Sequence, residues 1–186
     1  MFKVKVKNDI IAHCKEQLKK YNFGKRGYAD GTPEQQLVGI IGQTVILDLF
    51  DLAWIDGGKG FDGGIDLVYN GISIDIKTMG RTTEVRSYYV NNFIALQKKY
   101  DVEAYIFASY NKIKKEITLV GWLPKQLFED KADFFQKGAY RTRSDGTKFK
   151  TFSDLYEIKN SDLFDVKSIN DLKKQINTYF HRYNKL

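Results

Sequence analysis

Apolar and polar residues alternate on both sides of a sharp turn in the middle of the chain, in the run IDLVYNGISIDIKT at residues 65–78. This run contains Asn70-Gly71, the preferred pair for a two-residue type I′ turn, because both positions need a positive φ. A two-residue loop fixes the strand register, so the turn predicts a β-hairpin in which Asp66 lies opposite Asp75. One face of this hairpin is apolar or aromatic. The other face carries Asp66, Val68, Ser73, Asp75 and Lys77.

Apolar residues at helical spacing predict three longer helices in the rest of the chain. The first covers about residues 8–23. The second follows Thr32, which forms a capping-box pattern with Gln35, and it runs to about residue 50. The third follows Ser168, a favoured residue type at a helix N-cap.

Shorter runs bounded by turn residues predict the remaining elements. Strands are predicted at residues 52–55, 103–110, 116–123 and 154–158, and helices at 91–100 and 124–137. Near the N-terminus apolar residues alternate with lysines, a pattern that permits a short edge strand or an extended arm.

Length and composition indicate one globular domain. The 186 residues are 42% hydrophobic, enough for one core, with a central region at about 32–110 and a C-terminal extension at about 111–186. The net charge of +7 favours a polyanionic partner, although a basic surface without such a partner fits equally well. The single cysteine, Cys14, excludes an internal disulfide and is expected in the core. No signal-peptide pattern or long apolar run is present, so we expect a cytoplasmic protein without a membrane segment.

The two opposed carboxylates of the hairpin need a positive partner. Like charges directly opposite each other in a sheet repel, and aspartate is depleted from strands. Lys77, on the same face, is one candidate partner. In that alternative the hairpin face is exposed to solvent and the lysine balances the two aspartates. A hard divalent cation such as Mg²⁺ or Mn²⁺ is the better candidate, because such ions take carboxylate and carbonyl oxygens as ligands.

These residues carry a family resemblance. Asp66 followed by Asp75-Ile76-Lys77 resembles the metal-binding signature of the PD-(D/E)xK nuclease superfamily, the restriction-endonuclease-like enzymes. Ile65 stands where the name of the signature has Pro, and Asp75 takes a place more often held by Glu. The predicted order of elements also resembles the αβββαβ core of that superfamily, an α/β fold with a mixed central sheet flanked by helices. Here an N-terminal helix and a C-terminal strand and helix extension would be added.

The resemblance implies a Mg²⁺-dependent (or Mn²⁺-dependent) deoxyribonuclease, and more specifically an endonuclease. It implies Asp66, Asp75 and the Ile76 carbonyl as metal ligands and Lys77 as a catalytic residue. Several branches place a further acidic ligand on the helix before the sheet, a place that Glu34 matches. The alternative for Glu34 is a first-turn glutamate that complements the helix dipole.

The resemblance leaves two further points open. Asp62, in the glycine-rich loop before the hairpin, is a reserve ligand. Many small relatives act as dimers to cut two strands, so a homodimer is compatible with the resemblance.

Basic residues outside the hairpin are candidates for contact with DNA, the expected partner. Arg81 and Arg86 follow the hairpin, and Arg141, Arg143 and Lys148 lie in a segment where basic and aromatic residues interleave. Such a segment can follow a phosphate backbone and stack bases, and the alternative is a polar surface loop. The main rival function is a non-catalytic DNA-binding or assembly protein on the same fold. An enzyme acting on a small phosphorylated substrate is less favoured by the basic composition.

Overall fold

The computed structural model describes residues 1–24, 31–60, 63–142 and 146–183. Two helices form one side of the molecule, α1 (Asn8–Lys20) and α2 (Pro33–Leu49). The predicted capping box at the start of α2 is confirmed, because the Thr32 side chain accepts from the Gln35 N–H while the Gln35 side chain accepts from the Thr32 N–H. Cys14 is fully buried between these helices, as expected, with Sγ 3.3 Å from Thr44 Oγ1.

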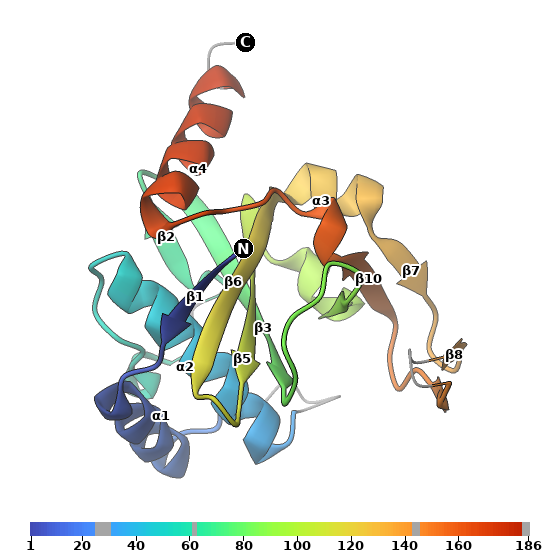
Figure 1. Ribbon diagram of the computed structural model, residues 1–186, viewed down its shortest axis with the longest axis horizontal. Helices are drawn as coiled ribbons and strands as arrows, with labels where there is room; N and C mark the ends of the chain where they lie inside the picture. The colour runs from blue at the N-terminus through green and yellow to red at the C-terminus, as the bar shows by residue number, and fades with distance from the viewer. Residues whose placement is uncertain (25–30, 61–62, 143–145, 184–186) are drawn as a thin grey trace.

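A five-stranded mixed sheet forms the centre of the molecule (Figure 1). Its strands in spatial order are β1 (Phe2–Lys5), β6 (Glu116–Pro124), β5 (Ala104–Asn111), β3 (Ile72–Arg81) and β2 (Leu67–Tyr69). The parallel pair is β3 with β5, and the other three pairs are antiparallel. The predicted hairpin is confirmed in its register from Leu67, which pairs with Ile74, to Tyr69, which pairs with Ile72. The predicted pair of Asp66 with Asp75 does not form in the ladder, because β2 begins at Leu67 and the Asp66 N–H donates to the Ile74 carbonyl. The N-terminal alternation forms an edge strand of this sheet.

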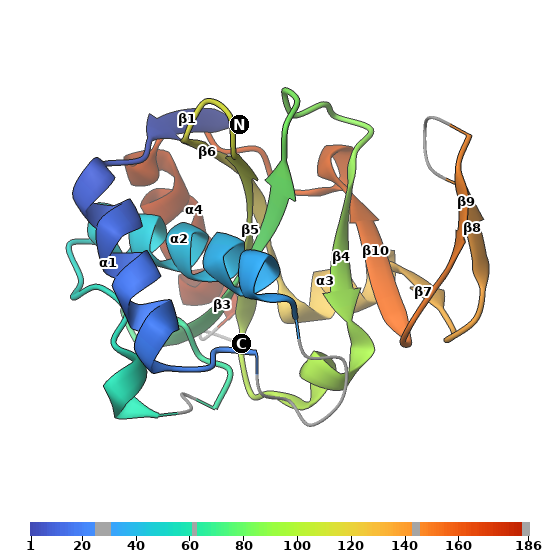
Figure 2. The same ribbon diagram turned by 90° about the horizontal axis from the view of Figure 1, so that it is seen from below.

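A second layer of strands covers the other side of the central sheet (Figure 2). It is a three-stranded antiparallel sheet in the order β4 (Val90–Ile94), β10 (Leu155–Lys159) and β7 (Asp133–Phe135). The short helix α3 (Lys125–Lys131) follows β6 on the same side. The two-stranded hairpin of β8 (Tyr140–Thr142) and β9 (Lys148–Lys150) projects from this layer.

Alternation along β3 separates two hydrophobic clusters. The larger cluster packs Ile72, Ile74 and Ile76 of β3 against α1 and α2, and the smaller one packs residues of β5, such as Tyr105 and Phe107, against β4 and α3. Because successive strand residues point to opposite faces, Asp75 and Lys77 lie on the side of the smaller cluster. The apolar face predicted for the hairpin therefore forms part of the main core.

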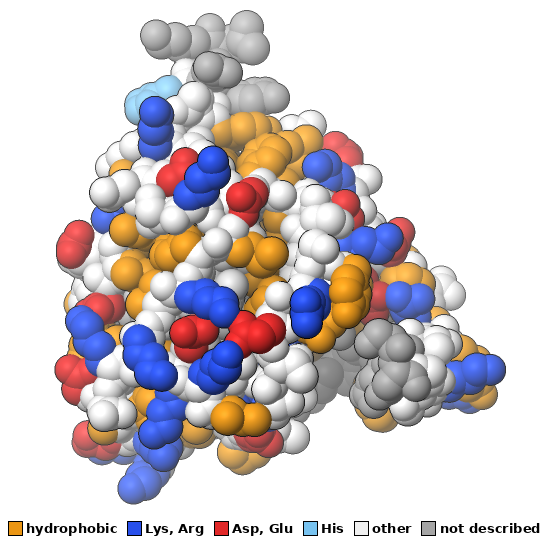
Figure 3. Space-filling model, viewed as in Figure 1, with side chains coloured by type: hydrophobic (Ala, Val, Ile, Leu, Met, Phe, Trp, Pro, Cys, Tyr) orange, Lys and Arg blue, Asp and Glu red, His pale blue; other side chains and the backbone are white. Residues whose placement is uncertain are grey.

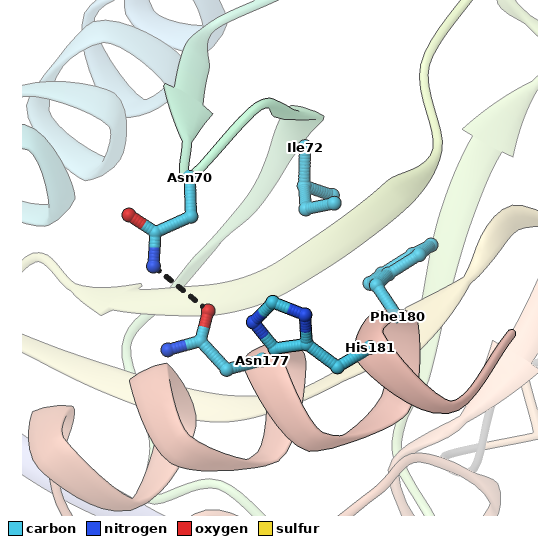
Figure 4. A pocket seen from close by; sticks show the side chains of 5 residues that line it. All are labelled: Asn70, Ile72, Asn177, Phe180 and His181. Atoms are coloured by element: carbon cyan, nitrogen blue, oxygen red, sulfur yellow. Dashed lines mark hydrogen bonds between the residues drawn. The ribbon is translucent and has the colours of Figure 1, made fainter. Parts of the chain in front are cut away.

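The helix α4 (Ile169–Tyr183) closes the larger cluster at the hairpin end. Its buried Leu172 and Ile176 belong to that cluster. Asn177 accepts a hydrogen bond of 2.9 Å from the Asn70 side chain at the turn of the β2–β3 hairpin, beside a hollow of about 30 Å³ (Figure 4). The turn itself has φ of 50° at Asn70 and 82° at Gly71, as a type I′ turn requires. The third predicted helix is thus confirmed, and it packs against the β2–β3 hairpin at its turn.

The α/β class is confirmed, with a mixed sheet and four α-helices in the described ranges, but the order of elements differs from the expected αβββαβ core. The strand expected at 52–55 is absent there, and among the described residues between α2 and β2 the one regular element is the short 3₁₀ helix η1 (Gly57–Lys59). The connection from β3 to β5 contains β4 and the 3₁₀ helix η2 (Ala95–Lys99) where a helix was expected. The helix expected at 124–137 ends early, at Lys131, and β7 follows it.

Candidate active site

Asp75 and Lys77 form an ion pair on one face of β3. Lys77 Nζ lies 2.7 Å from Oδ1 and 2.5 Å from Oδ2 of Asp75. Asp75 is 3% exposed, while the Lys77 side chain keeps 16% of its surface, so the lysine lies between the carboxylate and solvent. The Lys77 ammonium is also 5.2 Å from the ring centre of Phe93 in β4. The part of the hairpin face around Asp75 and Lys77 is therefore covered, whereas Val68 on the same face is 56% exposed.

Asp66 reaches the same segment of β3 through the backbone. It lies one residue before β2, and its N–H donates to the Ile74 carbonyl at 3.0 Å. Its Oδ2 accepts from the Ile76 N–H at 2.6 Å. The Asp66 carboxylate therefore takes the place of a backbone carbonyl: it accepts the hydrogen bond that a longer β2 would accept from the Ile76 N–H. Asp66 thus contacts the backbone of β3 at Ile76, the residue between Asp75 and Lys77.

Tyr105 is a site neighbour that sequence reasoning missed. It pairs with Asp75 in the parallel β3–β5 ladder, is fully buried, and its hydroxyl makes no hydrogen bond within the described residues. Burial raises the pKa of this hydroxyl, and the negative charge of Asp75 raises it further. Local sequence gives no signal for this neighbour, because the pairing joins residues thirty positions apart.

The donor set fits a hard divalent cation by its chemistry. Two carboxylates and the Ile76 carbonyl offer oxygen ligands, and Asp75 Oδ2 is a buried oxygen without a hydrogen bond of good geometry despite its closeness to Lys77. Within the described ranges no group of three or more His, Cys, Asp or Glu side chains could hold a metal. The sequence predicted three carboxylate ligands, Asp66, Asp75 and Glu34, and the structure does not gather all three. Asp62, the reserve ligand, lies outside the described residues.

Glu34 is not brought to this site. Its carboxylate is exposed and pairs with Lys112 Nζ at 2.7 Å. The helix α2 packs on the opposite face of β3, where Val38, one turn after Glu34, touches Gly80. Gly80 is five residues beyond Asp75, or about 17 Å along a strand. Glu34 instead lines a separate pocket of about 260 Å³ between α1, α2 and the β5–β6 turn.

The two arginines after the hairpin have different surroundings. Arg81 donates from Nη2 to the Val90 carbonyl at 2.8 Å and stacks on Tyr89, with its guanidinium carbon 4.6 Å from the ring centre. Burial lowers its pKa. Through these contacts Arg81 stabilises the loop that follows β3. Arg86 is exposed in that loop, and its carbonyl accepts a hydrogen bond from Asn160.

The basic residues of the 140–150 segment also differ in their surroundings. Arg141 forms an ion pair with the buried Glu157 of β10 and lies over Phe135, so it faces the protein and not a solvent-borne ligand. Lys148 is exposed on β9. Arg143 lies outside the described residues.

Comparison with protein-family models, curated proteins and solved structures finds no match. Within the described residues, no helix has both the length and the apolar character needed to cross a membrane.

Proposed function

We propose that the chain is a metal-dependent nuclease that hydrolyses phosphodiester bonds in DNA, most simply as an endonuclease. The observation that supports this best is the convergence of Asp66, Asp75 and Lys77 on one short segment of β3. Carboxylates combined with a cationic side chain suit a site that must bind both a cation and a phosphate. The net charge of +7 agrees with a polyanionic substrate.

In this proposal Asp66, Asp75 and the Ile76 carbonyl would hold one or two Mg²⁺ or Mn²⁺ ions. Such an ion, when bound, lowers the pKa of its water and neutralises charge on the phosphate oxygens. Lys77 neutralises Asp75 in the structure and would turn toward the attacking water and the phosphate. There its fixed ammonium stabilises the charge that develops as water bonds to phosphorus and the ester oxygen leaves. The partly exposed Lys77 side of the pair is where substrate would enter.

A specific observation also favours the rival, a non-catalytic DNA-binding or assembly protein. The Asp75 carboxylate is 3% exposed and already neutralised by Lys77, as in an ion pair that serves only packing. A buried pair of this kind can specify one arrangement of a core without adding stability. In that case Asp66 would serve only as the acceptor that ends the β2–β3 ladder.

Cleavage assays on plasmid, linear, branched and single-stranded DNA with Mg²⁺ or Mn²⁺ separate the two functions. We expect the wild type to cut at least one of these substrates and both Asp66→Asn and Lys77→Gln to lose cutting. The side-chain carbonyl of the introduced asparagine can still accept from the Ile76 N–H, so the first change removes charge with little change in shape. Glu34→Gln is the matched control and keeps activity, because Glu34 pairs with Lys112 away from the site. Circular dichroism checks that each variant is folded. Unchanged metal-dependent cutting by a folded Lys77→Gln protein would overturn the proposal.

A further inference from the structure

The β8–β9 hairpin is a small ribbon with two different faces. Its cross-strand pairs are Tyr140 with Lys150, Arg141 with Phe149, and Thr142 with Lys148. Because pairs alternate between faces, Tyr140, Thr142, Lys148 and Lys150 share one face, and all four are exposed. Figures 1 and 2 show the hairpin projecting from the body of the protein. We call the exposed face the outer face.

The inner face anchors the hairpin to the body. Arg141 pairs with Glu157, and its guanidinium carbon lies 3.7 Å from the ring centre of Phe135. At the base of the hairpin, the buried Thr151 donates from Oγ1 to the Gln136 carbonyl at 2.6 Å. The Thr151 carbonyl also accepts from the Gly138 N–H at 2.9 Å. An isolated two-stranded hairpin is marginally stable in water, so these contacts explain how the outer face is held away from the core.

The outer face combines exposed aromatic rings with positive charge. Tyr140 is 71% exposed, and Phe152, which follows the hairpin two residues after Lys150, is 88% exposed. The Lys150 ammonium lies over the Tyr140 ring, 4.7 Å from its centre, so a base would stack on the other face of this largely exposed ring. Figure 3 shows basic and hydrophobic side chains together on this projection, at the lower right. Large exposed aromatics on a rigid support mark an interaction surface, and adjacent lysines select an anionic partner.

We infer that the outer face of the β8–β9 hairpin binds an unpaired nucleic-acid strand, with a base stacked on Tyr140 and phosphates near Lys148 and Lys150. This inference rests on the proposed function and narrows its substrate to DNA that contains a single-stranded segment. Stacked bases inside a duplex do not present their faces to a protruding ring, whereas unpaired bases do. Arg141 is paired with Glu157, so the two lysines, and not Arg141, would contact the phosphates.

Fluorescence anisotropy in EDTA tests this inference without any cleavage. The probes are a labelled single strand of about 15 nucleotides and a duplex of the same sequence. Base stacking contributes about 1–3 kcal/mol, so Tyr140→Ala should weaken single-strand binding by about 5- to 160-fold and change duplex binding much less. Tyr140→Phe keeps the ring and should bind like the wild type. Ile113→Ala, at a residue 72% exposed on the β5–β6 turn, is the control for losing an exposed apolar side chain.

Charge is tested separately through the salt dependence. Lys148→Gln and Lys150→Gln should each reduce the slope of log affinity against log salt by about 0.7 for the single strand. Equal binding of the single strand by Tyr140→Ala and the wild type would overturn the inference. So would equal weakening for single strand and duplex, or no binding of the single strand by the wild type, results that fit an apolar protein partner. A wild type that binds the single strand in EDTA through Tyr140 but cuts no DNA with Mg²⁺ or Mn²⁺ would instead count against the proposed function alone.

Discussion

The approach of α2 to β3 leads to a quantitative prediction, because two glycines of one helix differ in what surrounds them. A Cβ built on Gly42 would lie 1.9 Å from Thr78 Oγ1 and 2.7 Å from both Cβ and Cγ2 of Thr78. A Cβ on Gly39 would meet nothing within 4 Å. Ordinary carbon contacts are about 3.5–4.0 Å. Rotation of the Thr78 side chain cannot remove the clash, because its Cβ atom is fixed by the strand backbone.

The expected energies follow from these distances. Replacing Gly by Ala inside a helix stabilises it by about 1 kcal/mol, and Gly39→Ala should show this gain. Overpacking costs about 1–3 kcal/mol, and the fixed Thr78 Cβ favours the upper end of that range. Because the helix-propensity gain of about 1 kcal/mol offsets part of this cost, Gly42→Ala should lower the free energy of unfolding by about 2 kcal/mol. Thr78→Ala removes Oγ1 and Cγ2 but not Cβ, so it should relieve only part of the loss in the double variant.

Urea unfolding followed by circular dichroism measures both effects at unchanged m-value. Thr78 directly follows Lys77, so a displaced β3 in Gly42→Ala should also reduce any activity of the site. The packing described for α2 and β3 would be refuted if Gly42→Ala were as stable as Gly39→Ala, since then the helix could not lie against Thr78.

Two further predictions concern charges. Lys77→Met leaves the 3% exposed Asp75 without its partner and should destabilise the protein by about 3 kcal/mol in urea unfolding, and a loss under about 1 kcal/mol would contradict the buried pair. Hydrogen bonds and charge from Lys114 and Lys3 lower the pKa of Glu84 from 4.5 to about 2. Because the folded state lowers this pKa, the ionised Glu84 stabilises the protein above pH 4.5, and this stabilisation is lost as the pH falls toward 2. Glu84→Gln should therefore flatten the dependence of the urea midpoint on pH in that window, and an unchanged dependence would contradict the assignment.

The elements that sequence predicted best are those decided by neighbours in the chain. Asn70-Gly71 needs only its own two positive φ angles to set the hairpin register, and the Thr32–Gln35 capping box closes within one turn of helix. The elements predicted wrongly depend on distant partners. Residues 91–94 form a strand because β4 pairs with β10, more than sixty residues later in the chain. That pairing overrides the local helical pattern.

The missing strand at 52–55 has a similar cause. Its side chains and backbone are bound by other parts of the chain, since the Trp54 indole donates to Asp48 at 3.0 Å and His13 hydrogen-bonds the Ile55 carbonyl at 2.8 Å. The contact with His13 satisfies the Ile55 carbonyl, a backbone acceptor that a strand would have placed in a ladder.

The candidate site was predictable in part, again according to the range of the contacts. Asp75 and Lys77 lie two residues apart on one strand, and the local register of the β2–β3 hairpin brings Asp66 to the backbone of that strand at Ile76. The partners of Glu34 and Arg141 could not be found in this way. Lys112 lies 78 residues after Glu34 and Glu157 lies 16 residues after Arg141, and each pair forms only when separate elements pack together. The contact of Lys77 with Phe93 likewise depends on the position of β4, which no local pattern gives.

Calorimetric titration with Mn²⁺ tests most directly whether Asp66 and Asp75 hold a cation. The wild type and Glu34→Gln should bind Mn²⁺ alike, and Asp66→Asn should lose that binding while keeping its fold. Equal Mn²⁺ binding by Asp66→Asn and the wild type, or none by the wild type, would contradict the metal site and with it the proposed nuclease.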